Sequence, residues 1–214
     1  MEQEGEMEVE SPNQQTQAVP QFPALSAQAV VGGKIETRKI LVPQHRINPI
    51  KEHWMELVTP IVQQLKLQIK MNLPKRTILI RTSPETTEAS ALQKAADFVQ
   101  AVVMGFDVND ALALVRLDDL YIDSFDVQDV KNLQGDHLSR AIGRIAGRDG
   151  GVKFAIENAT KTRIVLEDNH CHILGSFNHI HMARDAICSL IMGSPPSRVY
   201  GHLQNVAAAA SQRF

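Results

Sequence analysis

The chain has 214 residues, of which 43% are hydrophobic and 21% are charged, a composition that is ordinary for a globular protein. Its formal net charge of −2 excludes a strongly basic protein, so any nucleic-acid binding has to come from a local patch of positive charge. Two cysteines are too few for a disulfide framework and indicate a reducing compartment, the cytosol or the nucleus.

The first segment, residues 1–36, starts with acidic residues and is rich in Glu, Gln, Pro, Ala and Gly. Such a composition buries too little apolar surface to offset the entropy lost on ordering, so it predicts a disordered acidic tail. The segment lacks the apolar core of a signal peptide, and no stretch of the chain approaches the ~18 apolar residues of a membrane span. We therefore expect no membrane partner.

Residues 37–115 predict a first domain in the order strand, helix, strand, strand, helix, helix. Hydrophobic spacing places these elements at 38–42, 48–65, 67–71, 77–81, 92–104 and 107–114. Pro60 interrupts the first helical pattern and is expected to kink or split that helix. Gly105 is expected to end the long helix.

Residues 116–194 repeat nearly the same order. The predicted strand, helix, helix, strand, strand and helix cover 120–127, 136–146, 152–159, 161–167, 170–174 and 177–191. Both halves also close on similar sequence, two apolar residues followed by Met-Gly. We predict an α+β protein that arose by internal duplication, with two tandem domains that each pack a three-stranded antiparallel sheet on helices.

The last segment, residues 195–214, has a different character. It begins with Pro195-Pro196 and becomes rich in alanine towards the end. Because the prolines cannot continue the preceding helix, we predict an extended C-terminal tail that orders only on a partner.

The most informative motif is Gly147-Arg-Asp-Gly150, a Gly-x-x-Gly turn between two predicted helices of the second half. The spacing alone is weak evidence, but its strand–helix–turn–helix–strand–strand–helix setting is the signature of a K-homology (KH) domain of type I. Glycine lets a sugar-phosphate chain lie against peptide amides, because a Cβ would hold it away. We expect the free N–H groups of Gly150, Gly151 and Val152 to face a phosphate at the helix start.

Charged side chains around the turn complete the candidate site. From residue 138 onward the chain carries 9 Lys and Arg against 5 Asp and Glu. Asp149 is unusual beside a phosphate and is expected to cap the following helix. The predicted RNA-binding residues are Arg144, Gly147, Arg148, Asp149, Gly150, Gly151, Lys153 and Arg163.

Bases could lie across a groove lined by Ile145, Ile156 and Ile164, although isoleucines at these positions are more typical of a core. A Gly147→Asp, Gly150→Asp double variant is expected to stay folded and to bind RNA weakly, since two carboxylates would face the phosphates.

The first half lacks this motif, because no glycine occurs between Lys34 and Met104. This copy either binds RNA differently or serves as a scaffold that faces another protein, and the sequence favours the scaffold.

Two other groups of side chains resemble metal sites only loosely. His170-Cys171-His172, with His179 and His181, lacks tetrahedral ligand spacing, and neighbours on a strand point to opposite faces. Five aspartates could serve a metal-dependent nuclease, but most are expected on a solvated strand edge and its turns: Asp118, Asp119, Asp123, Asp126 and Asp129. We predict no catalytic residue, no metal and no cofactor. Two alternatives stay open, a metal-dependent nuclease acting on RNA and a protein-interaction scaffold with a relic KH loop.

The stretch Ala141-Ile-Gly-Arg-Ile-Ala-Gly-Arg-Asp-Gly-Gly-Val-Lys-Phe-Ala-Ile-Glu-Asn-Ala-Thr160 closely resembles the partner-of-Nob-one family of KH proteins. The resemblance covers roughly residues 37–214. Arg148 departs from the family, which more often has lysine there, but the charge is kept. Further matching segments are 38–43, 53–54, 162–166, 172–175, 182–184, 192–196 and 199–201.

This resemblance implies a non-catalytic assembly factor of the small (40S) ribosomal subunit, with the glycine loop kept only in its second KH-like domain. It implies binding to single-stranded pre-18S ribosomal RNA near the 3′ end of that RNA. The implied protein partners are the endonuclease of the Nob family, which makes the final cut there, and other pre-40S assembly factors. The implied location is the nucleus and nucleolus, and also the cytoplasm with late pre-40S particles.

Overall fold

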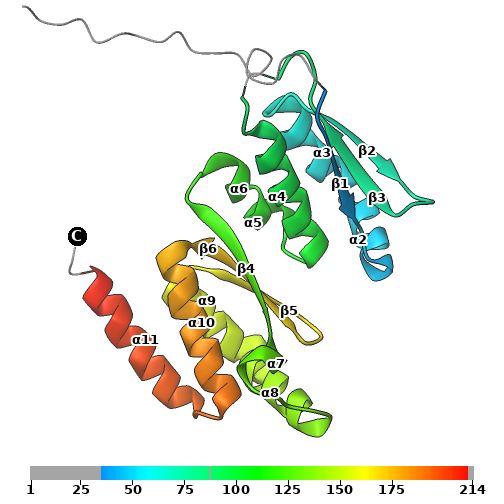
Figure 1. Ribbon diagram of the computed structural model, residues 1–214. Coiled ribbons are helices and arrows are strands. Elements are labelled where there is room, and N and C mark those ends of the chain that lie inside the picture. The colour runs from blue at the N-terminus through cyan, green and yellow to red at the C-terminus, as the bar shows by residue number, and fades with distance from the viewer. Residues whose placement is uncertain (1–34, 87, 212–214) are drawn as a thin grey trace, which may run out of the picture.

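The computed structural model describes residues 35–86 and 88–211, with side chains as far as Asn205. The predicted disordered tail, residues 1–36, lies outside this range except for its last two residues. The described chain forms two domains, each with a three-stranded antiparallel sheet and helices packed against it (Figure 1). The predicted α+β fold with two such domains is therefore confirmed. In the described part of the chain, no helix has the length and apolar character to span a membrane.

In the first domain the sheet has the order β1-β3-β2, so the last strand in sequence lies in the centre. Ile78 and Ile80 on β3 are completely buried against the helices, whereas Leu79 between them faces the other side. The elements are β1 (Thr37–Leu41), the 3-10 turn η1 (Gln44–Arg46), α2 (Ile47–Glu52), α3 (Trp54–Gln63), β2 (Gln68–Asn72), β3 (Thr77–Arg81), α4 (Ala91–Met104), α5 (Val108–Ala111) and α6 (Ala113–Arg116).

The break in the first helical region lies at His53, between α2 and α3, and the alternative that Pro60 splits the helix is wrong. Helix α3 runs through Pro60 to Gln63. Pro60 removes one backbone donor, but Leu57 and Ile61 on either side of it are completely buried. Packing of this face therefore outweighs the single missing hydrogen bond.

The second domain repeats the arrangement with the sheet order β4-β6-β5. A short helix that the sequence patterns did not predict, α7, follows β4 and starts with a capping box formed by Asp126 and Asp129. The elements are β4 (Leu120–Asp126), α7 (Val127–Val130), α8 (Asp136–Ala146), the 3-10 turn η2 (Arg148–Gly150), α9 (Gly151–Thr160), β5 (Arg163–Glu167), β6 (His170–Ser176), α10 (Phe177–Met192) and α11 (Pro196–Ser211).

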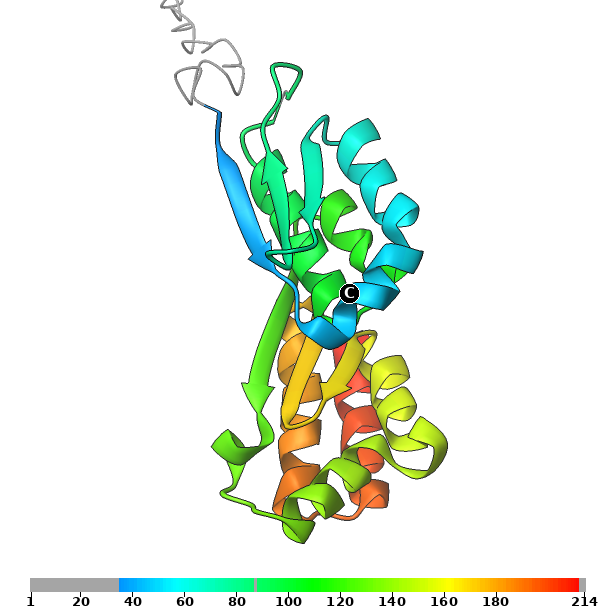
Figure 2. The same cartoon turned by 90° about the vertical axis from the view of Figure 1, so that its right-hand side faces the viewer.

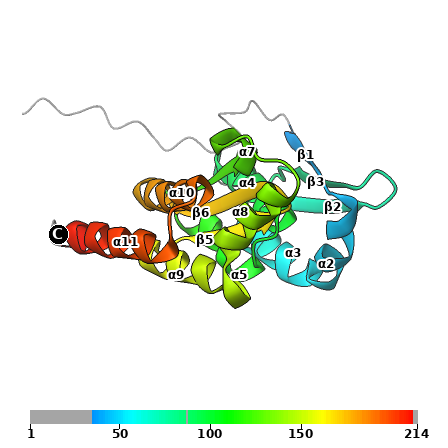
Figure 3. The ribbon, with the colours of Figure 1, turned by 90° about the horizontal axis from the view of Figure 1, so that it is seen from below.

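The predicted extended tail at 195–214 is wrong for its described part, because residues 196–211 form helix α11. This helix packs beside α9 and α10 (Figure 3). Pro196 opens it, a position where the fixed φ of proline suits the first helical turn. Val199 and Leu203, four residues apart, are buried in the core of the second domain. Helix α10 therefore ends at Gly193, and the proline pair lies at the start of the next helix.

The first domain lies on the outer face of the second sheet. Leu174 of β6 belongs to the core of the first domain, and Leu120 and Val165 pack against that core. The Nε of Arg163 donates to Asp110 of α5 at 2.9 Å, so a charged contact also crosses the boundary. One face of the second sheet is thus covered by its own helices and part of the other by the first domain.

Candidate nucleic-acid interface

The Gly-x-x-Gly turn connects the end of α8 to the start of α9. Gly147 has φ 75° and ψ −176°, a combination that is essentially restricted to glycine. A Cβ on Gly147 would lie 2.3 Å from Cγ2 of Val152 and 2.8 Å from its backbone nitrogen. Gly147 therefore has no side chain because the turn itself leaves no room for one.

Gly150 has a different role, although its φ is also 75°. A Cβ at this position would meet no atom within 4 Å, so the space beside it is open. This bare backbone lies at the start of α9, where the helix dipole favours an anion. The geometry permits a phosphate group to approach the peptide backbone at Gly150.

Arg148 supplies an unhindered positive charge at the turn. Its side chain is 97% exposed, and its Nε lies 3.9 Å from the carboxylate of Asp149, which is 95% exposed. So loose and solvated a pair holds the guanidinium only weakly. Arg148 can therefore turn towards a phosphate and donate to it.

Two expectations about the turn backbone are wrong. The side chain of Asp149 makes no capping hydrogen bond to α9. Asp149 instead has φ 53° and ψ 31°, a left-handed conformation that aspartate tolerates better than most residues. The N–H of Gly151 is not free, because it donates to the carbonyl of Arg148.

The expectation that a Gly147→Asp, Gly150→Asp double variant would stay folded also conflicts with the structure. Any side chain at Gly147 collides with Val152. Loss of RNA binding in that variant would not separate a damaged fold from a damaged site.

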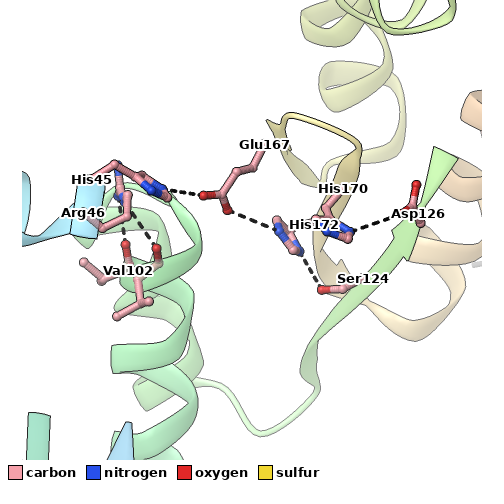
Figure 4. A network of polar contacts seen from close by, with 9 residues as sticks. His45, Arg46, Val102, Ser124, Asp126, Glu167, His170 and His172 are labelled. Atoms are coloured by element: carbon pink, nitrogen blue, oxygen red, sulfur yellow. Dashed lines mark hydrogen bonds and ion pairs between the residues drawn. The ribbon is translucent and has the colours of Figure 1, made fainter. Parts of the chain in front are cut away.

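Arg144 is engaged in a structural contact. Its Nε and Nη2 donate to the carbonyls of Leu190 and Ile191 at 3.2 and 3.4 Å, at the end of α10. Arg46 binds the end of α4 in the same way, with Nη2 2.9 Å from the carbonyl of Val102 (Figure 4). Each arginine donates to carbonyls in the last turn of a helix, where few backbone donors remain.

Lys153 lies in the first turn of α9, whose ten residues span about 15 Å, and Arg163 is the first residue of β5, beyond the other end of that helix. Lys153 is near the turn, with its Nζ 3.9 Å from Glu157 and its side chain 35% exposed. Arg163 is at the far end and pairs with Asp110 of the first domain. Of the predicted residues, the structure gathers six at the turn: Gly147, Arg148, Asp149, Gly150, Gly151 and Lys153.

The isoleucines considered as a surface for bases form the core instead. Ile145, Ile156 and Ile164 are at most 1% exposed. Phe154, which the sequence analysis missed, is 63% exposed on α9, three residues after Gly151. An exposed aromatic ring one helical turn after Gly150 offers a stacking surface for an unpaired base. The sequence could have indicated this exposure, because Phe154 and the buried Ile156 are two residues apart on α9 and so face different sides of the helix.

Glu157 was also missed and is a buried structural carboxylate. Only 7% of it is exposed, and its Oε1 accepts a hydrogen bond of 2.7 Å from the N–H of Ile164. This hydrogen bond joins α9 to β5 and so stabilises the position of α9, whose first residues form part of the candidate site. A polar residue in a helical pattern gives no indication of such a distant backbone partner.

The aspartates considered for a nuclease centre are engaged separately. Asp118 pairs with Lys94 at 2.8 Å, Asp123 pairs with Arg184 at 2.6 Å, and Asp126 accepts from the N–H of Gln128 at 2.9 Å. In the described part of the chain, no three His, Cys, Asp or Glu side chains gather as a metal site. Asp129 accepts from the N–H of Asp126 at 3.3 Å, so the structure shows ion pairs or a helix cap at four of these five positions.

A polar network joins the domains at another place (Figure 4). The carboxylate of Glu167 lies 2.6 Å from Nε2 of His45 in the first domain and 3.8 Å from Nε2 of His172. Nδ1 of His172 lies 2.7 Å from Oγ of Ser124. Burial lowers the pKa of His172 below its ordinary value; Glu167 opposes the shift, and His170 adds to it.

This pKa shift predicts a contribution of His172 to acid sensitivity. The unfolded chain binds a proton at His172 more readily than the folded chain, so stability is lost as the pH falls below the ordinary value of 6.5. We expect the melting temperature of the wild type to fall more between pH 7.5 and 5.5 than that of His172→Asn, which keeps a polar group near Ser124. Thermal unfolding checks this, and equal falls in both proteins would contradict it.

The two halves match two KH family models. Residues 124–208 match the eukaryotic-type KH domain (KH-domain type I), and residues 37–116 match the Krr1 KH1 domain. The RNA-binding protein PNO1 of Oryzias latipes is 57% identical over 208 residues, which cover 97% of this chain and 84% of that protein. The pre-rRNA-processing protein PNO1 of Saccharomyces cerevisiae is 56% identical over 201 residues, covering 92% and 73%.

Two solved archaeal structures are similar over most of the chain. One is Dim2p of Pyrococcus horikoshii in a complex with a/eIF2alpha and rRNA, with a TM-score of 0.72, 25% identity, and 82% and 96% of the two chains covered. The other is a protein of unknown function from Aeropyrum pernix, with a TM-score of 0.74, 25% identity, and coverage of 84% and 95%. The similarity therefore extends through both domains.

Proposed function

The chain belongs to the PNO1 family of KH-domain proteins, and on this premise we propose that it is a non-catalytic RNA-binding factor in the processing of ribosomal RNA precursors. Its relatives are named for RNA binding and pre-rRNA processing, and the Dim2p neighbour is in a complex with rRNA. The structure supports the proposal at the turn between α8 and α9.

The observation that carries the proposal is the open backbone of Gly150 beside the exposed guanidinium of Arg148. A phosphate can approach the start of α9 and receive charge-assisted hydrogen bonds from Arg148. Phe154 offers a ring on which an unstacked base can lie. These contacts suit single-stranded RNA, because bases paired within a duplex cannot reach an aromatic ring.

The family resemblance supports a finer proposal. The RNA would be the single-stranded 3′ region of pre-18S ribosomal RNA, bound during assembly of the 40S subunit. The protein would assist the final cut by an endonuclease of the Nob family and would meet other pre-40S factors. Its location would be the nucleus and nucleolus, and the cytoplasm with late pre-40S particles.

A direct binding comparison tests this function. The protein is titrated into two single-stranded RNAs of equal length, one from the 3′ end of pre-18S RNA and one from its 5′ end. We expect at least tenfold tighter binding to the 3′ RNA, with affinity that falls as salt rises because phosphate contacts release counterions. Equal affinities would overturn the assignment to the 3′ end.

The same RNAs test the two alternatives. Incubation with magnesium is expected to leave the RNA intact, and cleavage that exceeds the amount of protein would identify a nuclease. RNA affinity that is indifferent to changes in the turn would favour the scaffold with a relic loop.

A further inference from the structure

The two sheets differ in what covers their outer faces, the faces turned away from their own helices. The first domain packs on part of the outer face of β4-β6-β5, and Leu174 of β6 belongs to the core of the first domain. No ribbon lies over the corresponding face of β1-β3-β2 (Figure 2). The duplicated unit therefore has one outer face used as a domain contact and one that is open in the described chain.

On β3, the open face consists of the residues that alternate with the buried Ile78 and Ile80. On β1 and β2 it consists of the residues paired with them. The antiparallel register aligns them in three rows across the strands. The middle row is Lys39, Leu79 and Lys70. We call this surface the open sheet face, and its residues are Thr37, Lys39, Leu41, Gln68, Lys70, Asn72, Thr77, Leu79 and Arg81.

The charge on the open sheet face has a single sign. It carries Lys39, Lys70 and Arg81 and no aspartate or glutamate. Among the described residues, neither lysine lies within ion-pair distance of a carboxylate. Lys75 and Arg76 extend the positive charge into the turn between β2 and β3. A protein with a net charge of −2 thus concentrates cations on one exposed sheet.

The spacing of these cations is set by the backbone. Lys39 and Lys70 lie on the two edge strands, two strand spacings or about 10 Å apart. Arg81 lies two residues from Leu79 on the central strand, about 7 Å along it. Its Nε donates to Gln68 at 2.7 Å, which orients the guanidinium and leaves its terminal nitrogens for a ligand. The sheet therefore fixes the backbone positions of three cationic residues as a triangle.

We propose that the open sheet face binds the sugar-phosphate backbone of double-stranded RNA. Spaced cations on a surface without a bare-backbone turn can neutralise phosphates but cannot read splayed bases. The open sheet face also has no aromatic side chain for stacking. A folded segment of the RNA held at the glycine turn meets these requirements, so the inference rests on the proposed function. The first domain then binds RNA by a different chemistry from the second.

The test uses a Lys39→Glu, Lys70→Glu double variant and a matched control, Lys51→Glu, Lys131→Glu, which changes the net charge equally at exposed positions away from the open sheet face. The probes are a blunt RNA hairpin, a single strand, and the hairpin with that strand as a 3′ extension. Circular dichroism and thermal unfolding establish that both variants keep the fold.

We expect the double variant to bind both hairpin probes at least tenfold more weakly than the control and the single strand equally well. For the blunt hairpin, the slope of log affinity against log salt should decrease by the equivalent of about two phosphate contacts, one for each lysine. Unchanged hairpin binding would overturn the proposal. An acidic protein surface would then be the partner that the charge of the open sheet face suits. Failure of the proposed function gives a different result, because the wild type would then not bind the single strand. Binding of the blunt hairpin would still test the open sheet face in that case.

Discussion

Replacement of Arg148 by aspartate is expected to weaken binding of single-stranded RNA by tenfold or more while the protein stays folded. Arg148 is 97% exposed, and the substitution keeps both glycines of the turn. A hydrogen bond to a charged group contributes about 1.5–3 kcal/mol, and a factor of ten in affinity corresponds to about 1.4 kcal/mol. The new carboxylate also repels phosphate, which adds to the loss.

Fluorescence anisotropy with a labelled single strand at two salt concentrations measures this effect. The slope of log affinity against log salt should decrease by about one contact. Arg148→Lys keeps the charge and should lose much less, and Lys51→Glu in the first domain should bind like the wild type. If Arg148→Asp binds as tightly as Lys51→Glu, the turn does not contact the phosphates.

Replacement of Gly147 by alanine is expected to destabilise the second domain by about 3 kcal/mol or more. Overpacking of a tight site costs about 1–3 kcal/mol, and a non-glycine residue in this backbone region adds about 1–3 kcal/mol of strain. The alanine Cβ would lie 2.3 Å from Cγ2 of Val152 and 2.8 Å from a backbone nitrogen that cannot rotate away.

Gly150→Asn provides the contrasting variant. Asparagine tolerates a left-handed conformation, and no atom lies within 4 Å of the added Cβ. We expect near wild-type stability in denaturant but weaker RNA binding, because the amide occupies the approach to the backbone. Similar free energies of unfolding for Gly147→Ala and Gly150→Asn would contradict the different roles assigned to the two glycines.

Hydrophobic periodicity predicted most of the fold because the buried faces are regular. Ile78 and Ile80 alternate with Leu79 along a strand, and the long helices end at Gly105 and Gly193, both with left-handed φ. The turn at 147–150 was found for the same reason, since a local pattern places glycines between two amphipathic helices. These features depend on near neighbours in the sequence.

The errors concern features that depend on distant contacts. Helix α11 is stabilised by the burial of Val199 and Leu203 against α9 and α10. The sequence of a short Ala-rich segment does not indicate such a contact. Arg144 sits beside the turn in sequence, but its partners are carbonyls 46 and 47 residues away. Pro60 stays within a helix because the surrounding face is buried. Local sequence places a residue near a site but does not show which tertiary contact it makes.

Amide chemical-shift mapping shows where single-stranded RNA contacts the protein, and we expect that contact at the start of α9. The uniformly ¹⁵N-labelled protein is titrated with single-stranded RNA from the 3′ end of pre-18S RNA. We expect the largest shifts at the amides from Gly147 to Phe154, with smaller changes at Arg163 and across the first domain. Shifts concentrated elsewhere, with the amides of residues 147–154 unmoved at saturation, would contradict it.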